Sequence, residues 1–165
     1  MLAGPRTATA PEEGHDVSTD PLTLDNQVCF AAVLAARTVV SLYRPILEPL
    51  GLTHPQYLVM LALWERDDRS ISDLGGALQL EPATLTPLLK RLEAAGLVRR
   101  ARSADDERVV RVTLSDAGRA LREQAEQVPG RIAAQTGMSI SELMELRETL
   151  RGFVDRLGDR PAAGG

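Results

Sequence analysis

The chain contains a single cysteine, Cys29, in the stretch LDNQVCFAA at residues 24–32. A cysteine thiolate attacks peroxides and disulfides, and the backbone amides at a helix N-terminus favour the thiolate form. One thiol cannot form an internal disulfide, and a free cysteine is also a common small residue of hydrophobic cores. The stretch alone therefore leaves two interpretations open, an inert core thiol and a redox-active thiol.

A basic cluster at residues 88–102 is the second feature with a chemical meaning. Its local charge is +4, whereas the whole chain has a formal net charge of −4. Clustered positive charge attracts nucleic-acid phosphates, although it also occurs on ordinary solvated surfaces. The charged members are Lys90, Arg91, Arg99, Arg100 and Arg102, with Glu93 as the one acid.

The composition fits one globular domain, or a protomer that shares its core with a partner, since 44% of the 165 residues are apolar. A lone cysteine suits a reducing cytoplasm better than a secreted disulfide scaffold. Residues 1–20 contain no long apolar run, so we expect no signal peptide or membrane anchor there and predict a disordered tail. A second tail is predicted at 159–165. We expect a cytoplasmic protein with no membrane partner.

The element that must position Cys29 is a helix predicted over residues 24–47. Asp25 is the expected N-cap, which makes Cys29 the fourth helical residue, and Pro45 and Pro49 are expected to end the helix. Its apolar residues are too dense for one narrow buried stripe, which indicates more than one packing partner.

The basic cluster begins on the last of three further predicted helices. Capping-box pairs precede the first two, Thr53 with Gln56 and Ser70 with Asp73. Two short helices joined by a tight turn predict a helix-turn-helix. The segments are YLVMLALWE (57–65), ISDLGGAL (71–78) and EPATLTPLLKRLEAAG (81–96).

A β-hairpin and two more helices follow. Strands are predicted at 97–103 and 109–114, with the charged turn ADDER between them. Ser115 is expected to cap a helix to about Gln135 that is disturbed at Pro129 and Gly130. A last helix begins with the capping pair Ser139 and Glu142. Its apolar seam favours either a coiled-coil-like interface or an intrachain amphipathic helix.

This order of elements is a winged helix, and it places the basic cluster where that fold meets DNA. If the leucines of 85–92 pack inward, helical periodicity turns small, hydroxyl and basic residues outward, toward base edges and phosphates. Arg108 on the hairpin turn can reach the minor groove. Pro87 conflicts with a helix that begins at Pro82, so either the helix begins nearer Thr84 or it is kinked.

The span from Leu24 to Leu157 resembles the MarR-type winged-helix repressors, through LVRR (97–100), the wing DDERVVRVTLSDAG (105–118) and the flanking helices. Three stretches are similar to the OhrR branch, which senses organic hydroperoxides: LDNQVCF (24–30), LYRPILEPLGLTHPQYLVMLALWE (42–65) and TLTPLLKRLE (84–93). The resemblance implies a mainly α-helical homodimer with a small β-hairpin wing. Its N- and C-terminal helices would form the dimer, which would bind a near-palindromic double-stranded DNA operator.

In OhrR-like proteins the matching cysteine is the peroxide sensor, which implies that Cys29 is oxidised by organic hydroperoxides. With no second cysteine, the oxidised product would be a mixed disulfide with a low-molecular-weight thiol, or an overoxidised acid. Two tyrosines bond the family cysteine, and the matching positions are Tyr43 and His54, the latter a departure from the family. Along a continuous helix roughly 21 Å separate Cys29 from Tyr43. If Tyr43 bonds Cys29, it must therefore come from the other subunit; otherwise it is a core residue with its hydroxyl at the surface.

The resemblance and the residue pattern together predict five segments: tails at 1–20 and 159–165, a sensor and dimerisation helix at 21–50, a winged helix-turn-helix at 51–114 and dimerisation helices at 115–158. The predicted DNA-contacting residues are Ser70, Ser72, Ala83, Thr84, Thr86, Pro87, Lys90, Arg91, Arg100, Asp106 and Arg108.

Two alternatives to a redox-switched repressor stay open. A similar repressor could be released by a reversible small ligand, such as a phenolic acid. A thiol peroxidase has the nucleophile but lacks a second cysteine and an acid–base constellation, and it leaves the basic winged helix unexplained. We predict no cofactor and no metal site, since His54 with one cysteine is not a ligand set.

Overall fold

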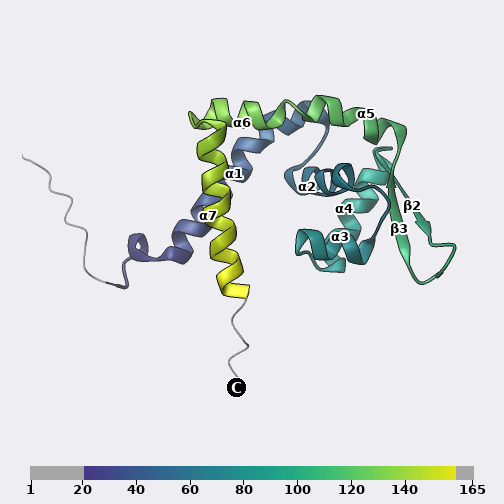
Figure 1. The fold of residues 1–165 in the computed structure, drawn as a ribbon, viewed down its shortest axis with the longest axis horizontal. Coiled ribbons are helices and arrows are strands. Elements are labelled where there is room, and N and C mark those ends of the chain that lie inside the picture. The colour runs from purple at the N-terminus through teal and green to yellow at the C-terminus, as the bar shows by residue number, and fades with distance from the viewer. Residues whose placement is uncertain (1–20, 159–165) are drawn as a thin grey trace, which may run out of the picture. The chain divides into compact units, whose positions relative to one another are not determined.

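The computed structural model describes residues 21–158 and confirms a mainly α-helical chain with a small antiparallel sheet (Figure 1). The tails predicted at 1–20 and 159–165 lie outside the described residues. The chain divides into two compact units, one up to Arg37 and one from Thr38 onward, and the division falls inside helix α1 (Val28–Leu47).

Helix α1 begins later than the sequence predicts. The chain first forms a 3-10 turn, η1 (Leu24–Asn26), and Gln27 then adopts an extended conformation with φ −91° and ψ 115°. Asp25 therefore lies within the 3-10 turn and is not the N-cap of α1. Because the extended residue delays the helix, Cys29 is its second residue and not its fourth.

The end of α1 also differs from the prediction, since the helix continues through Pro45 to Leu47. A proline in the last turn removes one backbone hydrogen bond, which a helix about to end tolerates. Pro49 lies in the next 3-10 turn, η2 (Glu48–Leu50). Within the described residues, Val28–Leu50 is the stretch long and apolar enough to cross a membrane by length and composition, a test that core helices of soluble proteins also pass.

Three mutually contacting helices form the helix-turn-helix: α2 (His54–Glu65), α3 (Ile71–Leu78) and α4 (Pro82–Ala94). Both predicted capping pairs are present before α2 and α3. α4 begins at Pro82 and contains Pro87, so the alternative of a later start near Thr84 was wrong. Fully buried leucines from the three helices form the core between them, namely Leu63, Leu74, Leu85, Leu89 and Leu92.

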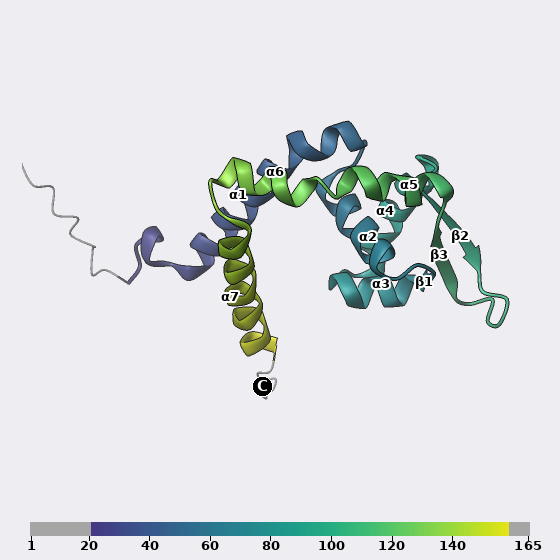
Figure 2. The same ribbon diagram turned by 45° about the horizontal axis from the view of Figure 1, so that its top comes forward.

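The sheet has three antiparallel strands in the order β1 (Arg69–Ser70), β3 (Val110–Leu114) and β2 (Val98–Arg102). β2 and β3 form the predicted hairpin, with Val98 opposite Leu114, and Figure 2 shows its turn extending away from α2, α3 and α4. β1 was not predicted, because two residues are too few to show an alternating pattern.

The segment after the hairpin forms three helices, α5 (Asp116–Ala125), α6 (Val128–Thr136) and α7 (Ile140–Gly158). Ser115 caps α5 by accepting a hydrogen bond from the Gly118 amide at 3.0 Å. The predicted helix to Gln135 is interrupted at 126–127, before Pro129. Pro129 is tolerated in the first turn of α6, where its missing N–H would have no intrahelical partner.

Candidate nucleic-acid interface and sensor site

The outward face of α4 carries the residues that the sequence places there. Lys90 and Arg91 are exposed in the second half of the helix. Thr86 is half-buried, and its hydroxyl donates to the Pro82 carbonyl at 2.7 Å. The face therefore carries small residues at its N-terminal end and basic residues at its C-terminal end, as a helix that enters the major groove requires. The other exposed members are Ala83, Thr84 and Pro87.

The turn between α3 and α4 holds this face in place. Gln79 ends α3 in the left-handed conformation at φ 52°, and the Leu80 amide donates to the Gly75 carbonyl at 2.9 Å. A Cβ at position 75 would lie 2.9 Å from the Leu80 carbonyl oxygen, so this tight turn requires glycine. At the start of α3, Ser70 accepts from the Asp73 amide at 3.0 Å, and Ser72 is exposed.

On the wing, Arg108 has a side chain that is 91% exposed and is held by Asp106. Its Nε and Nη2 donate to the two carboxylate oxygens at 3.1 and 3.2 Å. These hydrogen bonds lower the pKa of Asp106. Asp106 thus orients an arginine at the hairpin turn and leaves most of its guanidinium accessible to a phosphate or a narrow groove.

Arg100 is placed differently from the other basic residues predicted to contact DNA. Its Nε and Nη2 donate to Glu93 Oε2 at 2.9 and 2.6 Å, and its backbone amide donates to Glu93 Oε1 at 2.9 Å. Its side chain is 22% exposed, and the bonds lower the pKa of Glu93. Arg100 therefore joins strand β2 to the end of α4, and its contact with DNA stays a prediction.

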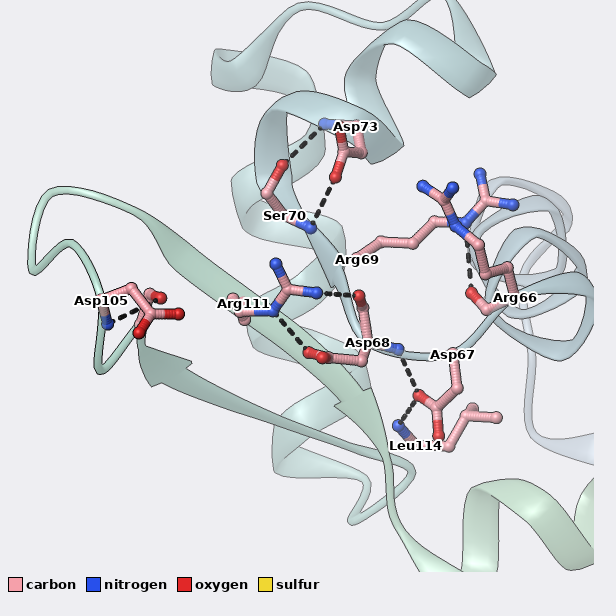
Figure 3. Close-up of polar contacts among 10 residues, drawn as sticks. Arg66, Asp67, Asp68, Arg69, Ser70, Asp73, Asp105, Arg111 and Leu114 are labelled. Carbon is pink, nitrogen blue, oxygen red and sulfur yellow. Dashed lines mark hydrogen bonds and ion pairs between the residues drawn. The ribbon is translucent and has the colours of Figure 1, made fainter.

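A group of charged residues at the base of the wing was missed by the sequence analysis, and Figure 3 shows its members Asp67, Asp68 and Arg111. Asp67 and Asp68 lie between α2 and β1. Asp68 bonds Arg111 of β3, and Asp67 bonds the Leu114 amide of β3 and Arg119 of α5. No local pattern links these residues, because Arg111 is 43 positions away from Asp68. Their only sequence signal was the pair of adjacent aspartates after the apolar run of α2.

The two predicted partners of the cysteine lie together in the second unit. The rings of Tyr43 and His54 are edge to face with centroids 5.0 Å apart. Burial raises the pKa of Tyr43 and lowers that of His54, so both are uncharged hydrogen-bond donors at neutral pH. Tyr57, the other tyrosine of the chain, is a core residue with 4% exposure. Cys29 belongs to the first unit, where its side chain is exposed.

A cavity of about 540 Å³ opens beside His54. Its walls combine apolar groups with Arg44, Glu48 and the hydroxyl-bearing Thr53. The volume is within the range of small-molecule sites. The remaining lining residues are Val40, Gly51, Leu52 and Pro55.

Two helices carry apolar faces that the single chain leaves exposed. Residues 31–40 of α1 are all exposed, and they include Val33, Leu34, Val39 and Val40. The predicted seam of α7 begins with Leu143, which packs against the core of the chain. Its other members are between 38% and 54% exposed, namely Leu146, Leu150, Phe153 and Leu157. Contiguous exposed apolar faces are typical of protein–protein interfaces.

Within residues 21–158 no three His, Cys, Asp or Glu side chains are arranged to hold a metal ion.

Comparison with known proteins identifies the fold and the site region together. The family model described as transcriptional regulator SarA/Rot matches residues 41–124, which include the helix-turn-helix and the wing.

Two sequence relatives and one solved structure cover most of the chain. The HTH-type transcriptional regulator TtmR of Methylorubrum extorquens is 43% identical over 96% of this chain and 80% of its own length. The organic hydroperoxide resistance transcriptional regulator of Bacillus subtilis is 38% identical over 84% of this chain and 94% of its own. AbfR of Staphylococcus epidermidis superposes with a TM-score of 0.66 at 36% identity, over 83% of this chain and 95% of AbfR. Reduced AbfR and overoxidised AbfR have both been solved bound to DNA.

Proposed function

The chain belongs to the SarA/Rot family of winged-helix, MarR-like transcriptional regulators, and on this premise we propose that it is a homodimeric repressor released from its operator when Cys29 is oxidised by organic hydroperoxides. The homologues and the fold are those of DNA-binding regulators and not of enzymes, which removes the thiol-peroxidase alternative. The observation that carries the redox proposal is a lone cysteine in the first turn of α1, in a chain 38% identical to the Bacillus regulator.

We propose that α4 reads the major groove and that Arg108 reaches the minor groove. The exposed small and basic residues of α4 support the first contact, and the 91% exposed Arg108 supports the second. The proposed contact set is the one predicted from the sequence: Ser70, Ser72, Ala83, Thr84, Thr86, Pro87, Lys90, Arg91, Arg100, Asp106 and Arg108. A cytoplasmic location follows from this function, since the operator is there.

The dimer would use the exposed apolar faces of α1 and α7. Two winged helices related by a two-fold axis contact half-sites about one DNA turn apart, so the operator should be near-palindromic. In this division, residues 21–50 and 115–158 serve dimerisation and residues 51–114 serve DNA binding.

The proposed switch begins with attack of the Cys29 thiolate on the peroxide oxygen of an organic hydroperoxide. An S–O bond forms as the O–O bond breaks, the sulfur is oxidised by two electrons, and the alkoxide takes up a proton and leaves as an alcohol. A low-molecular-weight thiol then attacks the sulfenic acid, which forms a mixed disulfide and releases water.

Tyr43 and His54 are the proposed donors to the thiolate. Along α1, Tyr43 follows Cys29 by fourteen residues, which corresponds to roughly 21 Å of helix. The donors would therefore come from the partner subunit, and the sensor would be built across the dimer interface. A bulky adduct there would change the separation of the two α4 helices, and both half-sites could no longer bind at once.

The covalent step is tested by intact mass after treatment with a hydroperoxide and a small thiol. The wild-type chain should gain the mass of one thiol adduct, and the Cys29→Ser chain should gain none. An unmodified wild-type chain under conditions that release DNA would contradict the proposal.

The cavity beside His54 supports one alternative, a regulator released by a small aromatic acid. Arg44 in its wall could pair with a carboxylate. The alternative predicts that Cys29→Ser binds the operator and is released by a phenolic acid. The redox proposal predicts no release of this variant by either reagent.

A further inference from the structure

Asp67 and Asp68 make several bonds that converge on the base of the wing. Asp68 adopts the left-handed conformation at φ 57°, and the Asp67 carboxylate accepts from the Asp68 amide at 2.8 Å. The same Asp67 oxygen accepts from the Leu114 amide of β3 at 2.8 Å. The other oxygen pairs with Arg119 of α5. This turn thus ties the last residue of the wing to the helix that follows it.

Arg111, the second residue of β3, completes the group. Its Nε donates to Asp68 Oδ1 at 2.7 Å, and a second guanidinium nitrogen donates to the Asp68 carbonyl (Figure 3). β3 is also paired to β1, with Ser70 opposite Arg111, and Ser70 is the N-cap of α3. The backbone that carries the wing is therefore fixed to the start of the helix-turn-helix.

We propose that Asp67, Asp68, Arg111 and Arg119, here called the wing brace, are positioning residues for DNA binding: they set the wing's direction relative to α3 and α4 without touching DNA. The inference rests on the proposed DNA-binding function. It predicts that affinity for the operator depends on two carboxylates, although carboxylates repel phosphates.

The sign of this effect separates positioning from simple electrostatics. Neutralising an acidic residue near DNA should strengthen binding if charge alone matters, because repulsion of the phosphates is removed. Asparagine tolerates the left-handed conformation, so Asp68→Asn keeps the backbone and removes the charge. A loss of affinity in this variant would thus reflect the weakened bonds to Arg111.

The test is operator binding by fluorescence anisotropy for Asp68→Asn, Arg111→Gln and the double variant, at several salt concentrations. A partly exposed ion pair contributes modestly, so Asp68→Asn should bind about two- to fivefold more weakly. Its salt dependence should match that of the wild type, because no phosphate contact is lost. Arg111→Gln should have a much smaller effect in the Asp68→Asn background than in the wild type.

Glu107→Gln is the matched control, since Glu107 is an exposed acid on the same hairpin and its side chain forms no ion pair within residues 21–158. This control should bind as well as the wild type or better. Hydrogen exchange of the β3 amides, measured without DNA, should be faster in Asp68→Asn at an unchanged melting temperature.

Two results would overturn the brace: operator binding by Asp68→Asn that equals or exceeds the wild type, or additive effects of the two substitutions. If the wild type itself fails to bind its operator, the proposed function is wrong, and faster β3 exchange in Asp68→Asn would still establish the brace as a structural contact.

Discussion

Gly118→Ala should displace the start of α5 from the hairpin. A Cβ at position 118 would fall far inside van der Waals contact with the Leu97 carbonyl oxygen, 3.1 Å from the carbonyl carbon and 3.3 Å from the Leu114 side chain. The obstacle is backbone, so no rotamer change relieves it. The Leu97 carbonyl also accepts from the Ser115 amide at 3.0 Å, so any shift weakens the junction of α5 with the hairpin.

The expected cost is about 1–3 kcal/mol of unfolding free energy, the usual range for overpacking a tight core site. The chain contains one tryptophan, and the Trp64 indole donates to the Gly118 carbonyl at 2.8 Å. Urea unfolding followed by tryptophan fluorescence should therefore show a lower midpoint, and the folded-state emission should shift because this hydrogen bond is disturbed.

Gly130→Ala is the control for this substitution. Position 130 lies in α6, is exposed, and has nothing within 4 Å of an added Cβ. Alanine there should be neutral or stabilise the chain by up to about 1 kcal/mol. A Gly118→Ala chain with wild-type stability and unchanged Trp64 emission would refute the packing described at this junction.

Three further results are expected. Burial lowers the folded-state pKa of His54 from 6.5, so the unfolded chain binds the proton first and stability falls as pH drops below about 6.5. Below that pH the wild type should lose more stability than His54→Asn, and parallel pH profiles of the two chains in thermal melts would contradict this. Lys90→Ala should lower the slope of log affinity against log salt by about 0.9, and an unchanged slope would exclude a phosphate contact. Leu150→Glu, at a side chain 54% exposed in the single chain, should weaken the dimer by about tenfold or more in sedimentation experiments without unfolding the subunit, and an unaffected dimer would place the interface elsewhere.

The elements that the sequence predicted well have strong local signals. The capping pairs before α2, α3 and α7 fixed those helix starts, and alternating β-branched residues fixed the hairpin. The outward row on α4 followed from its leucine spacing, and each of its members is exposed or half-buried. Local propensity sufficed at these positions because the tertiary structure agrees with it.

The features that were missed depend on tertiary contacts. Glu93 forms an ion pair with Arg100, seven residues along the chain, and Asp68 pairs with Arg111 at a separation of 43 residues. Neither pairing follows from a helical or strand period. The start of α1 was misplaced because a 3-10 turn and an extended Gln27 use the same polar residues that would also fit a helix cap.

The positions of Tyr43 and His54, the proposed donors to Cys29, show what the family resemblance added. Tyr43 and His54 have no spacing that would bring them together, yet their rings lie 5.0 Å apart. Residue types alone would have assigned Tyr43 to the core and His54 to a helix end. The resemblance to OhrR-like proteins was the reason to group them as partners of Cys29, and their contact with Cys29 stays a prediction.

The central claim is that oxidation of Cys29 releases DNA. The most direct measurement is a titration of DNA from upstream of the protein's own gene, with and without an organic hydroperoxide, for the wild type and Cys29→Ser. The wild type should bind and be released by the hydroperoxide, whereas Cys29→Ser should bind with similar affinity and stay bound. Equal release of both chains by hydroperoxide would contradict the account.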